Sequence, residues 1–103
     1  MADFHKVATL SELKEGEVLG VEVGGERIAL YKIGEELFAT TDICTHDECH
    51  LSENFSVESE EVECTCHGSK FDIKSGEVVQ PPAFEPLQTF SVKVEGEDVL
   101  VEI

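Results

Sequence analysis

Cysteine and histidine side chains are concentrated in two short segments of this sequence. The first is Cys44-Thr45-His46, with Cys49 three residues further on, and the second is Cys64-Thr65-Cys66-His67. Thiolates and imidazoles are the side chains that bind zinc and iron in proteins. Single cysteines are often no more than small buried apolar residues, but two mixed segments in one short chain predict a metal centre.

Three kinds of metal centre are compatible with these residue types. A zinc finger pairs two cysteines in one segment with two histidines in another, whereas each segment here mixes the two. An all-cysteine iron–sulfur cluster would use the four-residue gap between Cys44 and Cys49, but it then needs a two-residue gap that Cys64 and Cys66 do not provide. The third kind is a [2Fe–2S] cluster in which histidines replace two of the four cysteines.

The third kind of centre is the one that the spacing favours, and here the sequence resembles a known family. Residues 44–49 read Cys-Thr-His-Asp-Glu-Cys and residues 64–71 read Cys-Thr-Cys-His-Gly-Ser-Lys-Phe. This pattern resembles Rieske-type proteins, and the resemblance extends over nearly the whole chain. It implies one [2Fe–2S] cluster, with Cys44 and Cys64 on one iron and His46 and His67 on the other.

The resemblance also implies roles for residues around the cluster. Cys49 and Cys66 occupy the positions that form a disulfide between the two loops in one branch of the family. The alternative is a pair of free thiols, which a reducing cytosol favours. Ser69 matches a serine whose hydroxyl donates a hydrogen bond to a cluster sulfide.

Three further residues complete the expected surroundings of the cluster. Gly68 is expected in the turn after His67, and Pro82 in a third loop that covers the cluster. Phe71 stands where family members of high reduction potential carry a tyrosine, whose hydroxyl points toward a cysteine sulfur. Phenylalanine has no hydroxyl, so this hydrogen-bond donor is absent here. We therefore expect an intermediate potential, within the span of roughly −150 to +300 mV of such centres. Because reduction adds negative charge beside the imidazoles, the potential should become dependent on pH in alkaline solution.

The segments outside the two motifs predict short strands and turns. Alternating apolar residues indicate strands at 18–23 and 27–33, joined by Gly24-Gly25, with further strands at 37–40, 71–73, 77–79, 90–94 and 99–103. A helical turn capped by Ser11 is expected at 9–13. The sequence thus predicts an all-β fold, a small sandwich or partly open barrel. Residues 1–103 would form one domain, with a scaffold of 1–41 and 87–103 and a loop-rich, cluster-binding insertion of 42–86.

Composition limits the classes of partner. The chain has 103 residues and a formal net charge of −16, from 7 Lys and Arg against 23 Asp and Glu. This charge argues against binding to nucleic acid or to an anionic membrane, and it favours a basic protein partner. The chain has no run of about 18 apolar residues and no apolar leader at Met1, so we expect a cytoplasmic protein.

The resemblance finally implies a function. The ferredoxins of aromatic-ring dioxygenase systems carry single electrons from a flavin-dependent reductase to a terminal oxygenase, and no acid–base or nucleophilic set outside the motifs predicts an enzyme. We expect a monomer that meets both partners transiently through its acidic surface. Alternatives are a small nitrite reductase subunit, a subunit of a quinol-oxidising cytochrome complex, which would need a membrane anchor, and a zinc-stabilised interaction module. His5 and His50 lie outside the ligand spacing and are expected at the surface.

Overall fold

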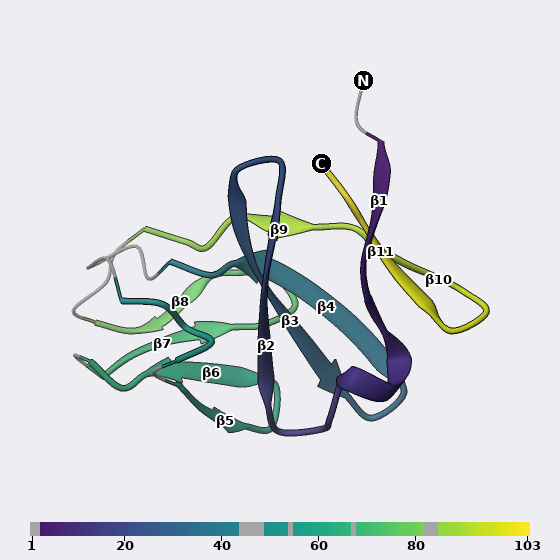
Figure 1. The fold of residues 1–103 in the computed structure, drawn as a ribbon. Coiled ribbons are helices and arrows are strands. Elements are labelled where there is room, and N and C mark those ends of the chain that lie inside the picture. The colour runs from purple at the N-terminus through teal and green to yellow at the C-terminus, as the bar shows by residue number, and fades with distance from the viewer. Residues whose placement is uncertain (1–2, 44–48, 54, 67, 82–84) are drawn as a thin grey trace.

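The strands form three antiparallel sheets that lie in layers (Figure 1). The computed structural model describes residues 3–43, 49–53, 55–66, 68–81 and 85–103. The first sheet contains β1 (Phe4–Thr9), β11 (Asp98–Glu102) and β10 (Val92–Glu95), in that order. The second contains β2 (Val18–Val23), β3 (Glu26–Ile33), β4 (Glu36–Thr41) and β9 (Thr89–Phe90). The third contains β5 (Phe55–Glu58), β6 (Glu61–Cys64), β7 (Ser69–Asp72) and β8 (Val78–Gln80).

The second sheet is the middle layer, and its strand β3 is buried on both faces. Successive side chains of a strand point to opposite faces. On β3, Ile28 and Leu30 join the core shared with the first sheet, whereas Ala29 and Tyr31 join the core shared with the third. All four are at most 1% exposed. The continuous apolar run of β3 is therefore the sequence signature of a central strand.

The core beneath the third sheet also contains polar groups. The Tyr31 hydroxyl lies 2.8 Å from Oγ1 of buried Thr40. Burial raises the pKa of the Tyr31 phenol, and the nearby Asp42 carboxylate acts in the same direction, while the hydrogen bond with Thr40 opposes them. The phenol therefore stays protonated and available for this hydrogen bond.

The structure confirms the all-β prediction and most of the expected strands. The hairpin of β2 and β3 pairs Val18 with Tyr31 and Val23 with Glu26, as the turn at Gly24-Gly25 requires. The sheets do not close into a barrel. The division into scaffold and insertion stays a prediction.

The structure also differs from the predictions in several places. Strands β1, β5 and β6 had no predicted counterpart. The helical turn is a 3₁₀ helix, η1 (Leu10–Glu12), and its N-cap residue is Thr9 rather than the predicted Ser11. Oε1 of Glu12 accepts a hydrogen bond from the Thr9 amide at 2.9 Å, which completes a capping box. The described residues form no helix long and apolar enough to cross a membrane.

Candidate functional site

The second cysteine–histidine segment forms the turn between β6 and β7. Cys64 ends β6, is fully buried, and pairs in register with Ser69 at the start of β7. Gly68 has a φ of +81°, a conformation that favours glycine, and its amide donates a hydrogen bond to the Cys64 carbonyl at 2.8 Å. The sequence prediction that Gly68 lies in the turn is therefore confirmed. His67, the expected ligand that follows Cys66 in the sequence, lies outside the described residues.

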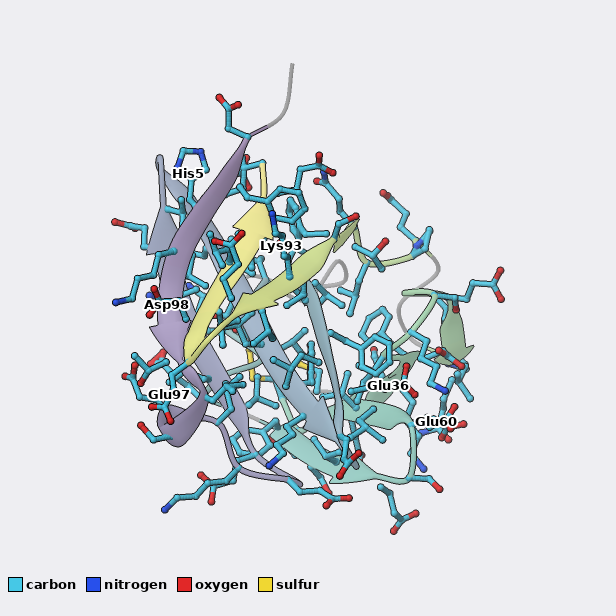
Figure 2. The ribbon with its side chains drawn as sticks, turned by 90° about the vertical axis from the view of Figure 1, so that its right-hand side faces the viewer. His5, Glu36, Glu60, Lys93, Glu97 and Asp98 are labelled. Carbon is cyan, nitrogen blue, oxygen red and sulfur yellow. A yellow bond between two sulfur atoms is a disulfide. The ribbon has the colours of Figure 1, made fainter. Side chains whose placement is uncertain are left out.

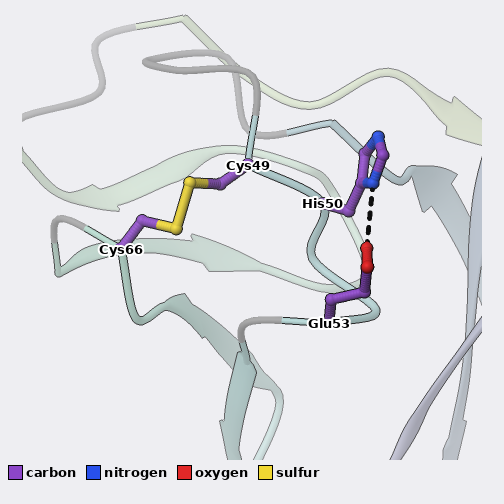
Figure 3. The surroundings of a disulfide bond; sticks show 4 residues. All are labelled: Cys49, His50, Glu53 and Cys66. Atoms are coloured by element: carbon purple, nitrogen blue, oxygen red, sulfur yellow. Dashed lines mark hydrogen bonds and ion pairs between the residues drawn. A yellow bond between two sulfur atoms is a disulfide. The ribbon is translucent and has the colours of Figure 1, made fainter.

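A disulfide joins this turn to the first segment. Cys49 and Cys66 are bonded, with their Cα atoms 6.6 Å apart (Figure 3). This confirms the expected pairing and rejects the alternative of two free thiols. Cys44 and His46 lie outside the described residues, but Cys49 follows His46 by three positions. The disulfide therefore fixes one end of the first ligand segment to the second.

The disulfide also decides which cysteines could bind a metal. The sulfur atoms of Cys49, Cys64 and Cys66 all lie within 4.8 Å of one another. Two of these three sulfurs are bonded to each other, so this trio cannot act as three thiolate ligands. An all-cysteine cluster is thereby excluded while the disulfide is intact. The donor set that remains in the two segments is Cys44, His46, Cys64 and His67, which fits a [2Fe–2S] cluster with two cysteine and two histidine ligands.

Ser69 is buried directly beside this site. Its side chain is fully buried, and it faces the same side of the sheet as its register partner Cys64. Phe71, two residues further on, lies in the apolar core below. Ser69 is therefore a strand residue on the site's side of β7, and its expected hydrogen bond to the cluster stays a prediction.

The end of β8 also contacts this turn. Nε2 of Gln80 donates a hydrogen bond to the Gly68 carbonyl at 2.8 Å. Pro81 follows directly, so the proline-containing segment starts at the β6–β7 turn. Pro82 lies outside the described residues, and its expected position over the cluster stays a prediction.

The chain on either side of the first segment is held together at the end of the middle sheet. The residues that hold it there were not predicted from the sequence. Ile43 and His50 form an isolated antiparallel bridge. Next to it, the Asp42 carboxylate is fully buried and accepts hydrogen bonds from Arg27 and Ser52. Asp42 is one of 23 acidic residues, and nothing in the sequence distinguishes it from the others.

His50 is a surface residue, as predicted. Its side chain is 38% exposed, and Nδ1 lies 3.1 Å from Oε2 of Glu53 (Figure 3). This partner is a carboxylate on the outside of the segment.

The surface is acidic because the 23 Asp and Glu residues far outnumber the 7 Lys and Arg residues. Lys6, Lys74, Lys93 and Arg27 each form an ion pair with a carboxylate. Figure 2 shows Glu97 and Asp98 on one side of the molecule and Glu36 and Glu60 on the other. Nearer the site, a shallow hollow over β5, β6 and β7 is lined by Ser56, Glu58, Glu61, Glu63 and Lys70.

Comparisons with known proteins agree with this geometry. Residues 3–91 match the family model of the Rieske [2Fe-2S] domain. The chain is 44% identical over 98 residues to the biphenyl 2,3-dioxygenase ferredoxin component of Rhodococcus jostii (strain RHA1), covering 95% of this chain and 91% of the relative. It is 39% identical over 99 residues to the biphenyl dioxygenase ferredoxin subunit of Pseudomonas sp. (strain KKS102), covering 96% and 91%.

Solved structures give the same result. The ferredoxin of carbazole 1,9a-dioxygenase from Nocardioides aromaticivorans IC177 superimposes with a TM-score of 0.89 at 30% identity, covering 95% of both chains. A ferredoxin bound to its oxygenase, in a complex of reduced oxygenase and oxidized ferredoxin of carbazole 1,9a-dioxygenase, superimposes with a TM-score of 0.87 at 33% identity, covering 95% of this chain and 91% of that one.

Proposed function

This chain belongs to the family of Rieske [2Fe–2S] domains, and from this premise we propose that it is the ferredoxin component of an aromatic-ring dioxygenase system. It carries single electrons from a flavin-dependent reductase to a terminal oxygenase and catalyses no bond chemistry itself. The observation that carries the proposal is the disulfide between the two ligand segments. It removes Cys49 and Cys66 from ligation and leaves two thiols and two imidazoles.

In this proposal four residues hold the cofactor. Cys44 and Cys64 bind one iron, and His46 and His67 bind the other. When bound, a [2Fe–2S] cluster accepts and releases one electron, and histidine ligation makes it easier to reduce than four thiolates would. The chain supplies the buried side of this site through Cys64 and Ser69, while the core residue Phe71 excludes water from below. Four protein ligands leave no open position for a substrate.

Spectra of the purified protein test this proposal. We expect a red-brown protein with two irons and two sulfides per chain, silent in electron paramagnetic resonance when oxidised. After dithionite, its average g value should lie clearly below that of an all-cysteine cluster. A colourless protein that contains zinc would overturn the proposal in favour of a structural module. Copurification with a large sirohaem protein would instead indicate a nitrite reductase subunit.

Ser69→Ala should lower the reduction potential, because the hydroxyl would stabilise the more negative, reduced cluster. A loss of about 1.4 kcal/mol of preferential stabilisation corresponds to about 59 mV for one electron. Spectroelectrochemical titration of both proteins measures the shift. Ser56→Ala, at an exposed position of β5, two strands away from β7 in the same sheet, is the matched control and should leave the potential unchanged. An unchanged potential in Ser69→Ala would refute the hydrogen bond.

The acidic hollow over β5–β7 is the surface nearest the site on which a basic partner could dock. Oε2 of Glu63 lies 3.7 Å from the position that a Cβ on Gly68 would occupy, so negative charge reaches the ligand turn itself. Charge complementarity of this kind raises association rates and is screened by salt.

Electron transfer between the reductase and the oxygenase should therefore slow by a factor of about 10 or more as salt rises from about 0.01 to 1 M. Neutralising Glu61 and Glu63 as glutamines should slow transfer at low salt. Glu97→Gln, in the β10–β11 turn of another sheet, removes one negative charge and should have little effect. Transfer that is independent of salt and of these substitutions would contradict docking through this face.

The remaining expectations complete the proposal. Residues 1–103 form one domain, a scaffold of 1–41 and 87–103 with a cluster-binding insertion of 42–86. The protein works in the cytoplasm as a monomer, where it alternates between reductase and oxygenase. Support comes from the acidic composition and from the transient, electrostatic type of contact that electron carriers form.

A further inference from the structure

A fully buried carboxylate lies at the base of the first ligand segment. Oδ2 of Asp42 accepts hydrogen bonds from Nη2 of Arg27 at 2.9 Å and from Oγ of Ser52 at 2.8 Å. Oδ1 accepts a third from the Ser52 amide at 2.7 Å. Asp42 is 0% exposed, whereas the Arg27 side chain is 33% exposed. A buried charge is tolerated only when it is paired and hydrogen-bonded in this way.

The main chain of Asp42 makes two more connections. Its amide donates to the Arg27 carbonyl at 3.0 Å, and its carbonyl accepts from the Leu51 amide at 2.6 Å. Asp42 therefore joins Arg27, at the start of β3, to residues 51–52 through both its backbone and its side chain. Cys44, His46 and Cys49 lie in the sequence between Asp42 and residues 51–52, so these bonds hold the two ends of their segment together.

A glycine in the middle sheet leaves room for the Ser52 side chain. Gly20 on β2 lies beside Ser52, and a Cβ at Gly20 would lie 2.8 Å from the Ser52 Cβ and 3.1 Å from Nη2 of Arg27. The first of these distances is shorter than real Cβ contacts. Glycine at this position lets Ser52 reach the Asp42 carboxylate. Gly20 has no positive φ, so close packing rather than backbone conformation explains it.

We propose that Asp42, with Arg27 and Ser52, is a clamp that positions the first ligand segment against the second. This proposal rests on the proposed function, and it adds residues that position the cluster ligands. The disulfide fixes the far end of the segment at Cys49, and the clamp fixes both ends of its base. Without the side-chain hydrogen bonds of the clamp, the base would be held only by the Ile43–His50 bridge and the backbone hydrogen bonds of Asp42, and the distances of Cys44 and His46 from Cys64 would vary more. Asp42 is thus a positioning residue that acts through the ligands.

Asp42→Asn tests the clamp with little change in shape. The amide keeps one acceptor oxygen, but it brings a donor against Arg27 or Ser52 and removes the charge that Arg27 pairs with. Asp98→Asn is the matched control, because Asp98 pairs with Lys6 at 3.2 Å on the surface of the first sheet. Val101→Ala is a second control that weakens a buried position of that sheet without touching the clamp.

Three readouts separate positioning from general destabilisation. Loss of iron to a ferrous chelator should become about 10-fold faster or more in Asp42→Asn, as for other residues that support metal ligands. The reduced-state spectrum should broaden, and amide hydrogen exchange in 49–53 should accelerate about 10-fold in protein freed of iron. Asp98→Asn should match the wild type in all three. Val101→Ala should change none of them beyond what its lower melting temperature explains.

Iron loss and hydrogen exchange in Asp42→Asn that equal those of Val101→Ala at matched distance from the melting temperature would overturn the clamp. If Asp42→Asn does not accumulate as folded protein, Ser52→Ala, which removes one of the three hydrogen bonds, decides the question by the same measurements. Wild-type protein without iron would refute the proposed function instead. Hydrogen exchange in 49–53 would still test the clamp in that case.

Discussion

Cys64→Ser is expected to give folded protein that holds at least about tenfold less iron than the wild type. Cys64 is the buried thiol at the end of β6, outside the disulfide, in the turn that carries His67. A serine hydroxyl at this position is a poor ligand for iron, because it is not ionised at neutral pH. Iron and sulfide analysis, together with the visible spectrum, measures the loss.

The same turn provides a control for Cys64→Ser. Thr65→Ser changes the adjacent residue, which is exposed, and should retain the cluster at wild-type stoichiometry. Circular dichroism should show that both variants keep their β structure. Cys64→Ser that retains a full cluster would refute the proposed ligand set and would require another donor from the two segments.

Removing the disulfide should have the second largest effect. Cys49 and Cys66 close a loop with a sequence separation of 17 residues. A crosslink over a loop of that size stabilises the folded chain by about 3 kcal/mol in the chain-entropy model. The double variant Cys49→Ser/Cys66→Ser should therefore melt roughly 12 to 24 °C lower. Because all four proposed ligands remain, it should still assemble the cluster.

The comparison between the two cysteine substitutions is more informative than either alone. Calorimetry and iron analysis should show opposite patterns: loss of the cluster in Cys64→Ser, and loss of stability with the cluster retained in the double variant. A double variant with the same melting temperature as the wild type would mean that the disulfide does not constrain the unfolded chain. A double variant without iron would mean that the disulfide is required to form the site.

The sequence predicted the chemistry of the site better than the sheets that hold it. The spacing of Cys44, His46, Cys64 and His67 indicates a specific kind of centre, because ligand chemistry limits which residues a cluster accepts. The hairpin of β2 and β3 was equally clear, because alternating apolar residues surround a glycine pair. The disulfide was expected only through the resemblance, since the spacing of cysteines alone does not fix their pairing.

The missed features depend on contacts between distant parts of the chain. Strand β1 has three apolar residues out of six and no strict alternation, and it forms because it pairs with β11 at the other end of the sequence. Strands β5 and β6 contain Glu58, Glu61 and Glu63, a residue type that is depleted in strands, so their composition does not indicate strands. The clamp at Asp42 brings together residues from three separate segments. Local sequence patterns carry no information about contacts between distant segments, so only the folded structure reveals them.

The side chains of β3 point alternately into the two cores, and this has a consequence for how the protein unfolds. Ile28 and Leu30 belong to one core and Ala29 and Tyr31 to the other, yet all four share one backbone. Neither core can melt alone, because releasing one set of side chains distorts the strand that carries the other. The two layers are thus thermodynamically coupled, and a chain of this size behaves as one cooperative unit. A substitution that weakens the core of the first sheet therefore lowers the stability of the third sheet as well.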